Sequence, residues 1–282
     1  MEDPSRMLPG APDAPAGRAE RPAWLAEPLQ LSWRFAYVWL RNLRVWRRYW
    51  FSNLLSSFLE PMLYLIGMGF GLGRHVSGIE GVPYQNFIAP GLVASSAMFA
   101  ATFECTFGTY VRMVYQKTFD AIIATPVSLD EVIAGELLTG ATKSAMYGSV
   151  ILLVITGAGL VPAPGPRLLL VPPAAFLTGL VFASLAMAVA AAVPQIEMLD
   201  YYFTLFITPT FMFSGIFFPL DDLPGWAQRV AGLTPLMHAV RLIRGLVMGR
   251  TGHLTGDALW LLVAALVLLP VPVLLMRRRL VR

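Results

Sequence analysis

Six long apolar segments constrain this chain more than any other feature of its sequence. Each is close to the roughly 20 residues that an α-helix needs to cross a bilayer. Only 13% of the residues are charged, about half the usual share, so the chain lacks the polar surface that a water-facing fold requires. We therefore predict an all-α, polytopic membrane protein with six transmembrane helices. The predicted spans are Leu54–Leu72, Phe87–Phe107, Val132–Gly157, Leu168–Val193, Tyr201–Phe218 and Leu254–Met276.

A seventh apolar stretch, Trp226–Met248, precedes the last predicted span. It is interrupted by Gly232, Pro235 and Gly245, and it carries several charged groups. Backbone that is not continuously helical is tolerated at membrane depth only where protein buries it. We expect a re-entrant hairpin here.

The distribution of basic residues predicts that both termini are cytoplasmic. With the N-terminus inside, fourteen Lys and Arg residues lie inside and six outside, which follows the usual cytoplasmic excess. Four of the six outer residues lie in the loop before the last predicted span, which is contrary to the usual depletion of basic residues outside. We expect a multi-pass protein of the cytoplasmic (inner) membrane, whose basic clusters suit anionic lipid rather than nucleic acid. The six outer residues are Arg74, Arg167, Arg229, Arg241, Arg244 and Arg250.

The region before the first span divides into two parts. Residues 1–30 are rich in Pro, Ala, Gly and charge, which predicts a disordered cytoplasmic tail. Residues 31–50 form an amphipathic pattern at helical spacing, typical of an interfacial helix that lies in the headgroup plane. An anchor with no role beyond orientation is the alternative. The apolar face consists of Leu31, Phe35, Val38, Trp39, Leu43, Trp46 and Trp50, and arginines occupy the other.

Four ionisable residues lie within the predicted spans: Glu60, Glu104, Glu136 and Lys143. On the predicted orientation all four occupy the cytoplasmic half of the membrane. Charged groups there cost several kcal/mol unless they are paired or hydrated. We expect a buried network of three carboxylates and one lysine. The alternative is that side chains near helix ends extend to the interface.

The cytoplasmic segment 112–131 between the second and third spans is amphipathic. Its apolar residues Met113, Phe119, Ile122 and Ile123 alternate with Arg112, Lys117, Asp120 and Asp130, and Pro126 ends the helical pattern. A short amphipathic helix in such a loop needs a surface to pack on. A cytosolic partner subunit is the functional interpretation, and packing on lipid is the alternative.

The sequence offers little support for catalysis. Three histidines, His75, His238 and His253, show no metal-site spacing, so we expect no metal or cofactor on this chain. The segment 140–144 (GATKS) lacks the preceding glycine of a phosphate-binding loop. Two alternatives to a transport subunit stay open: an intramembrane lipid-modifying enzyme that uses Glu60, Glu104 and Glu136, and a non-catalytic membrane scaffold.

The segment 223–245 (LPGWAQRVAGLTPLMHAVRLIRG) has a distinctive spacing. Leu223 and Pro224 are followed by Pro235, His238 and Arg244, which resembles the C-terminal signature of type-2 ABC transporter permeases. Phe213 departs from that pattern, which favours a smaller aliphatic residue there. The order of interfacial helix, six spans and cytoplasmic helix resembles the same family over nearly all of residues 31–282, which we assign to one type-2 ABC transmembrane domain.

Within this family the chain is most similar to the nodulation protein J group. The similarity lies in GLVASSAMFAATFE (91–104), GELLTGATKS (135–144), LTGLVFASLAM (177–187) and ITPTFMFSGIFFPLDDLP (207–224). The ATPVS motif (124–128) also resembles the drug-efflux branch, so the branch stays open.

The resemblance implies a permease subunit of an ATP-driven exporter. ATP and Mg would bind a partner ABC ATPase, and two copies of this chain would form a homodimer. Its cargo would be amphiphilic: a lipo-oligosaccharide, a glycolipid or a hydrophobic drug-like molecule. The interfacial and coupling helices would form the ATPase dock, with Arg112, Tyr115, Lys117, Phe119, Asp120, Thr125 and Pro126. Aromatic residues would line the path: Tyr64, Phe99, Phe103, Tyr201, Tyr202, Phe206, Phe211 and Phe213.

Overall fold

The computed structural model describes residues 31–76, 78–79, 81–162, 164–250, 252 and 254–280. The predicted disordered tail and His253 lie outside the described residues. Across the described part of the chain every regular element is a helix, apart from one isolated β-bridge between Ile79 and Val82. The predicted all-α class is therefore confirmed.

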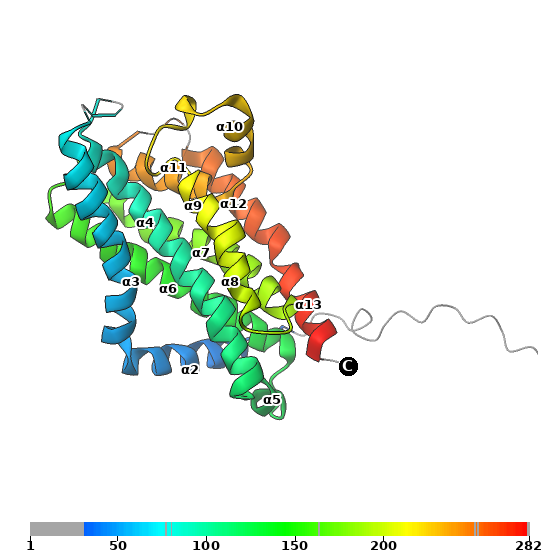
Figure 1. The fold of residues 1–282 in the computed structure, drawn as a ribbon. Coiled ribbons are helices and arrows are strands. Elements are labelled where there is room, and N and C mark those ends of the chain that lie inside the picture. The colour runs from blue at the N-terminus through cyan, green and yellow to red at the C-terminus, as the bar shows by residue number, and fades with distance from the viewer. Residues whose placement is uncertain are drawn as a thin grey trace, which may run out of the picture.

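The helices follow one another along the chain with short connections (Figure 1). The first half contains α2 (Phe35–Arg48), α3 (Trp50–Tyr64) with η1 (Leu65–Gly71) and η2 (Leu72–Arg74), α4 (Tyr84–Phe103) with η3 (Glu104–Gly108) and η4 (Val111–Tyr115), α5 (Thr118–Ile123) and α6 (Leu129–Gly157). The second half contains η5 (Pro166–Leu170), α7 (Val171–Ala192), α8 (Met198–Tyr202), η6 (Phe203–Ile207), α9 (Thr208–Met212), η7 (Leu220–Asp222), α10 (Gly225–Gly232), α11 (Pro235–Met248), α12 (Leu254–Leu268) and α13 (Pro270–Leu280).

Four described helices are long and apolar enough to cross a membrane. They are Tyr84–Tyr115, Leu129–Gly157, Pro166–Ala192 and Leu254–Leu280, and they contain the second, third, fourth and sixth predicted spans. The pair α10 and α11, bent by 84°, counts as a fifth if it is one broken span. The chain is a polytopic membrane protein, but the count of six is not confirmed.

The predicted fifth span ends earlier than expected. The continuous helix from α8 to α9 has fifteen residues, about 22 Å of rise, and stops at Met212. The chain then turns at Gly215, whose φ of 78° is left-handed, and Ile216 is fully buried against Gly91. The apolar run through Phe218 is therefore partly a turn packed on protein, which hydropathy cannot distinguish from helix.

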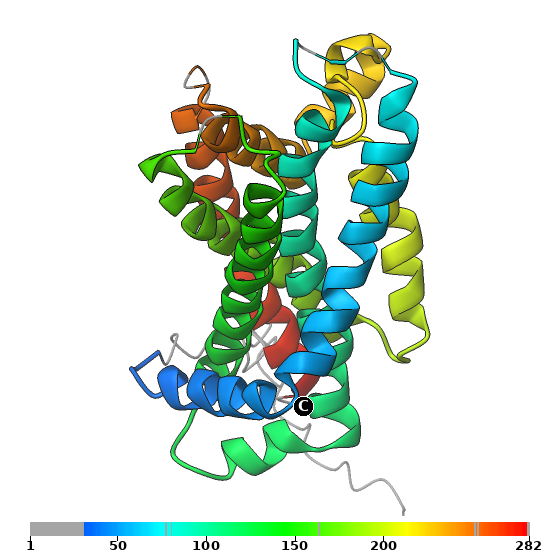
Figure 2. The same cartoon turned by 90° about the vertical axis from the view of Figure 1, so that its left-hand side faces the viewer.

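Helix α2 lies across one end of the bundle, close to α5, whereas α10 lies at the opposite end (Figures 1 and 2). The apolar face of α2 packs on α6. Val38 is buried, Trp39 Nε1 donates to Thr142 Oγ1 at 3.0 Å, and Trp46 Nε1 donates to the Tyr147 hydroxyl at 3.1 Å. The predicted amphipathic helix thus uses this face largely for protein contacts.

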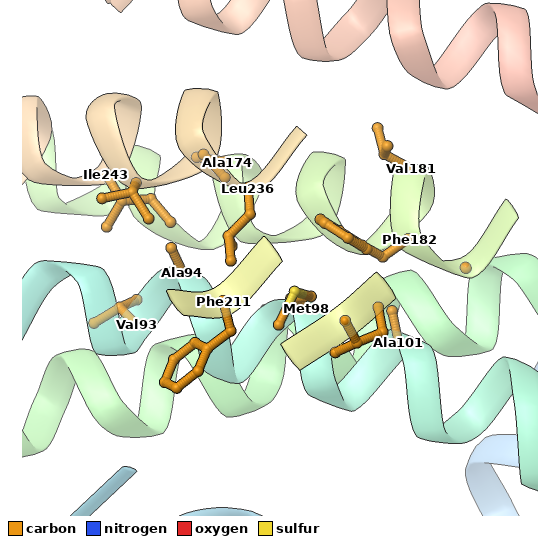
Figure 3. Packing of buried hydrophobic residues seen from close by; sticks show 14 of the residues in the cluster. Val93, Ala94, Met98, Ala101, Ala174, Val181, Phe182, Phe211, Leu236 and Ile243 are labelled. Atoms are coloured by element: carbon orange, nitrogen blue, oxygen red, sulfur yellow. The ribbon is translucent and has the colours of Figure 1, made fainter. Parts of the chain in front are cut away.

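Helix α4 is the centre of the core. In the long helix Tyr84–Tyr115, which begins with α4, 83% of the residues in an 18-residue apolar segment are buried. The corresponding share for the helix Leu254–Leu280 is 22%. Its side chains meet those of α7, α9 and α11 (Figure 3). Small residues allow the close approach: a Cβ on Gly140 of α6 would lie 2.7 Å from the Cys105 sulfur. Such small-residue contacts are typical of helix packing in membranes.

Candidate functional site

A charged junction joins three elements at the end of the bundle that carries α2 and α5. Glu104 and Arg112 lie on the η3 and η4 continuation of α4, and Glu136 and Lys143 lie on α6. The seven-residue spacing of the last two places them on one face of their helix. The η3 and η4 segments are π-helical turns, which often mark functional positions within α-helices.

Arg112 is the centre of this junction. Its Nε donates to Glu136 Oε1 at 3.1 Å, and its Nη2 pairs with Glu136 Oε2. The same Nη2 lies 2.9 Å from Glu104 Oε1, and Lys143 Nζ pairs with Glu104 Oε2. Because the Glu136 side chain is fully buried, two cations and two carboxylates satisfy one another away from solvent.

Helix α2 reaches the same carboxylate. Asn42 Nδ2 donates to Glu136 Oε1 at 2.9 Å and to Thr139 Oγ1 at 3.2 Å. Arg41 donates to Asn42 Oδ1 at 2.7 Å and lies 3.9 Å from Glu136 Oε1. Burial lowers the pKa of Arg41 from its usual value, and the Glu136 carboxylate opposes that shift. Glu136 therefore connects α2 to the long helix that contains α4.

The structure brings together three of the four predicted network residues. Glu104, Glu136 and Lys143 meet through Arg112, which sequence reasoning had placed in the cytoplasmic dock. Glu60 lies apart, on α3, with an exposed side chain. Asn42 was missed, because a single polar residue on an amphipathic helix carries no signal of its partner.

A small cavity of about 250 Å³ adjoins the junction. It lies between α2, the end of the α4 continuation and α6. Its lining combines the rings of Trp46 of α2 and of Tyr49, which follows α2, with the paired charges of the junction. The lining includes Arg41, Asn42, Trp46, Tyr49, Glu104, Arg112 and Lys143.

The coupling helix predicted over residues 112–125 is shorter than expected, and two of its apolar residues, Met113 and Phe119, are buried. Helix α5 begins at Thr118, after Lys117 takes a left-handed φ of 51° that ends the preceding helix. Phe119 is fully buried in the core, so it cannot contact a partner without unfolding. Arg112 takes part in the junction described above, and the other dock residues are exposed: Tyr115, Lys117, Asp120, Thr125 and Pro126.

The start of α2 holds the segment that follows α5. Ser32 N donates to Glu131 Oε1 at 3.0 Å, and Ser128 N donates to Glu131 Oε2 at 2.8 Å. Arg34 donates to the Pro126 carbonyl. A surface cavity of about 680 Å³ lies between these segments, with Trp33 and Ile123 in its lining. These hydrogen bonds hold the loop between α5 and α6 in one shape.

Two of the C-terminal arginines, Arg277 and Arg279, make contacts within the protein. Arg277, itself buried, donates to Asp130 Oδ1 at 2.8 Å and pairs with Oδ2. Arg279 donates to the Ala190 and Val193 carbonyls at 2.7 and 2.8 Å, where α7 ends. Sequence reasoning assigned these residues only to membrane orientation. No local pattern could reveal partners about ninety and 147 residues away.

The signature residues Leu223, Pro224, Pro235, His238 and Arg244 organise the opposite end of the molecule. Pro224 and Pro235 stand at the starts of α10 and α11, positions that suit proline. His238 Nδ1 lies 2.7 Å from Asp257 Oδ1, and its ring stacks on Trp260 at 4.1 Å.

Arg244 anchors the turn after α9. Its Nη2 donates to the Gly215 carbonyl at 2.7 Å, and its guanidinium lies 4.0 Å from the Phe87 ring centroid. Signature residues thus tie the bent helix pair to α4 and α12.

The aromatic residues form a connected series between α3, α4 and the helix from α8 to α9. Ring centroids are 5.4 Å apart for Tyr64–Phe211 and for Phe99–Phe211, and 4.5 Å for Phe103–Phe203. Tyr202 stacks on Phe206 at 5.4 Å. Phe211 is buried, whereas Phe103, Tyr201, Phe206 and Phe213 are exposed on the surface of this single chain.

Comparisons with known proteins agree with this architecture. The family described as ABC-2 type transporter matches residues 34–248. The chain is 39% identical to nodulation protein J of Sinorhizobium fredii over 78% of this chain and 83% of that protein. It is 40% identical to nodulation protein J of Rhizobium meliloti over 77% of this chain and 82% of that protein. It is 22% identical to the inner membrane transport permease YadH of Escherichia coli over 72% and 78%, respectively.

Proposed function

The chain belongs to the ABC-2 type transporter family, as a permease subunit similar to nodulation protein J, and from this premise we propose an ATP-driven exporter of amphiphiles. In this family the ATPase is a separate chain. We assign ATP and Mg to that partner and the transport path to this chain. Lipo-oligosaccharides, glycolipids and hydrophobic drug-like molecules are the cargo classes that we propose.

The observation that carries this proposal is the junction at Glu136. This one carboxylate binds Asn42 of α2 and Arg112 of the long helix, and it lies on α6. Displacing Arg112 would leave the buried Glu136 charge without its main cation, and displacing Asn42 would remove a hydrogen bond from the same buried carboxylate, so the elements are energetically coupled. A push on α2 or α5 by a hydrolysing ATPase would therefore reach two spans at once.

The dock that we propose is the exposed surface formed by the start of α2 and the segment after η4. Trp33 is 66% exposed and Tyr115 is 64% exposed, although both are large aromatic residues. Asp120 and Pro126 add polar and rigid exposed positions beside them. Because Glu131 and Arg34 hold the loop in shape, a partner would meet a preformed surface.

The cargo path that we propose follows the exposed aromatic face. Rings suit both sugar faces and acyl chains, which are the two parts of a lipo-oligosaccharide. The exposed Glu60 on α3 is costly against lipid, so this face favours either a second copy of the chain or a hydrated path. We propose that two copies enclose the path there.

This geometry does not favour the alternative of an intramembrane enzyme, because two of its three proposed catalytic carboxylates are bound in ion pairs. Glu104 and Glu136 are bound by Arg112 and Lys143, and Glu60 is far enough from them to share no contact in this group. Carboxylates held in ion pairs are poor acids and bases, because the pairing favours their charged form.

Reconstitution tests the proposal. The chain would be co-expressed with ABC ATPase subunits of the same genome, and the purified complex would be placed in liposomes. We expect ATP-dependent movement of a fluorescent lipo-oligosaccharide, glycolipid or hydrophobic dye, and none with an ATPase subunit that cannot hydrolyse ATP. If no ATPase subunit binds the chain, the proposal of an ATP-driven exporter is wrong. If an assembled, hydrolysing complex moves none of the three probes, the amphiphilic cargo is wrong.

A further inference from the structure

Three arginines that run against the predicted orientation gather around one cavity. Arg241, Arg244 and Arg250 belong to the loop region that the basic-residue pattern places outside. Basic residues are usually depleted there. The structure places them along a cavity of about 560 Å³ at the end of the bundle that carries α10 and α11, opposite α2 and α5. This volume lies in the usual range of small-molecule sites.

Two guanidinium groups of this cavity, those of Arg241 and Arg244, are held in place. Arg244 is fixed by the Gly215 carbonyl and the Phe87 ring, as described above. Arg241 Nε lies 3.4 Å from Asp257 Oδ2, while His238 binds the other oxygen of that carboxylate. Preorganised donors lose less entropy when they bind a ligand.

The charge of the lining favours an anion. Three arginines face two carboxylates, Asp221 and Asp257, and Asp257 already contacts both Arg241 and His238. Arginine forks bind phosphate, sulfate and carboxylate oxygens with two parallel hydrogen bonds. A partly enclosed cavity whose described lining includes three guanidinium groups therefore suits an oxyanion.

An apolar cavity of about 330 Å³ also adjoins the turn after α9. Phe213 lines the apolar cavity, and the next residue, Ser214, lines the arginine cavity. Phe206, Pro209, Trp226 and Val230 supply most of the remaining apolar wall. A ligand with an anionic group and a hydrocarbon chain matches this pair of surfaces.

The geometry points to an oxyanion-binding site in the arginine cavity that receives the anionic group of an amphiphile. The group is a phosphate, sulfate or carboxylate, carried either by the cargo as it leaves or by a lipid headgroup. The assignment to cargo rests on the proposed export function, whereas binding of the oxyanion itself does not.

Binding to the full chain in nanodiscs of neutral phosphatidylcholine tests this site without an ATPase. The probes are decyl phosphate and the neutral decyl maltoside, measured by titration calorimetry with empty nanodiscs subtracted. Arg250→Gln should weaken decyl phosphate binding about tenfold, because one charge-assisted contact is lost. Asp221→Asn should strengthen it, because a repelling carboxylate is removed.

Arg229→Gln is the matched control, since Arg229 is an exposed arginine of α10 outside the cavity. Effects of opposite sign from Arg250→Gln and Asp221→Asn cannot come from misfolding. Equal affinity in all four proteins, or equal binding of decyl maltoside and decyl phosphate, would overturn the proposal.

One further measurement, competition by an anionic lipid, distinguishes the sources of the anion. Competition by phosphatidylglycerol added to the nanodisc would identify a lipid headgroup as a ligand. Binding that persists in its presence would assign the site to the cargo. Because no ATPase is present, failure of the export proposal leaves these results unchanged.

Discussion

The guanidinium of Arg112 binds both carboxylate oxygens of Glu136, through Nε to Oε1 at 3.1 Å and through Nη2 to Oε2. The two residues belong to different spans and are 24 positions apart. This fork makes the end of the α4 continuation and α6 one unit at the point where α2 contacts them.

Removing Arg112 should destabilise the protein strongly. Arg112→Gln leaves two buried carboxylates with one cation fewer, and breaking one partner of a buried pair typically costs about 3–5 kcal/mol. Thermal unfolding of the purified protein in detergent measures the loss. Arg44→Gln, on the exposed face of α2, is the control and should change little.

A second substitution should recover part of this loss. In Arg112→Gln/Glu136→Gln both charged groups of the fork are gone, so the double variant should unfold at a higher temperature than Arg112→Gln alone. A double variant that is less stable than either single variant would show that the pair is not the source of the loss.

Phe119 and Asp120 should behave differently although they are adjacent. Phe119→Ala removes a fully buried ring, which typically costs about 3–5 kcal/mol, and should lower the yield of folded protein. Asp120→Ala should leave folding intact and weaken association with the ATPase, which pull-down measures. Glu197→Ala, another exposed carboxylate, is the matched control. Unchanged association of Asp120→Ala would exclude this residue from the dock.

The ion pair between Arg277 and Asp130 should be exchangeable in direction. Arg277→Asp or Asp130→Arg alone places like charges together and should lower the unfolding temperature by several degrees. The combined exchange should restore part of it, because the pair forms again with its polarity reversed. Additive losses in the combined variant would mean that the two side chains do not interact in the membrane-embedded protein.

Gly179 should tolerate no side chain. A Cβ there would overlap Ser144 of α6 and approach Ala141 Cα to 3.0 Å, so Gly179→Ala should push α6 and α7 apart. Overpacking of this kind costs about 1–3 kcal/mol. Gly157→Ala is the control, because nothing lies within 4 Å of its added Cβ. Equal melting temperatures for the two variants would contradict the close packing of α6 on α7.

Local patterns in the sequence predicted much of the architecture. Hydropathy and length located the four long helices, and amphipathic spacing located α2. The turn at Gly215 was missed, because an apolar turn buried by protein has the same hydropathy as a helix. The break within the coupling segment at Lys117, after which α5 begins, was missed because it depends on one backbone angle.

Long-range pairing explains the other differences. The sequence placed Glu104, Glu136 and Lys143 in one zone of the membrane but gave no reason to add Arg112 or Asn42. Asp257 and Asp130 each pair with a histidine or arginine on another helix, and the sequence alone does not indicate these partners. Phe119 was assigned to a surface because spacing shows which residues share a face and not which face is covered.

The contact between α13 and the start of α6 also sets an order of assembly. Asp130 precedes its partner Arg277 by 147 residues, so the ribosome has made nearly all of the helices before this pair can form. A nascent chain can insert its early spans and form the contacts of Ser32 and Arg34 with this loop, yet the ion pair at Asp130 is added only when α13 has been made. If the ATPase binds at the dock that we propose, we expect it to meet the complete surface only on chains whose synthesis has passed α13.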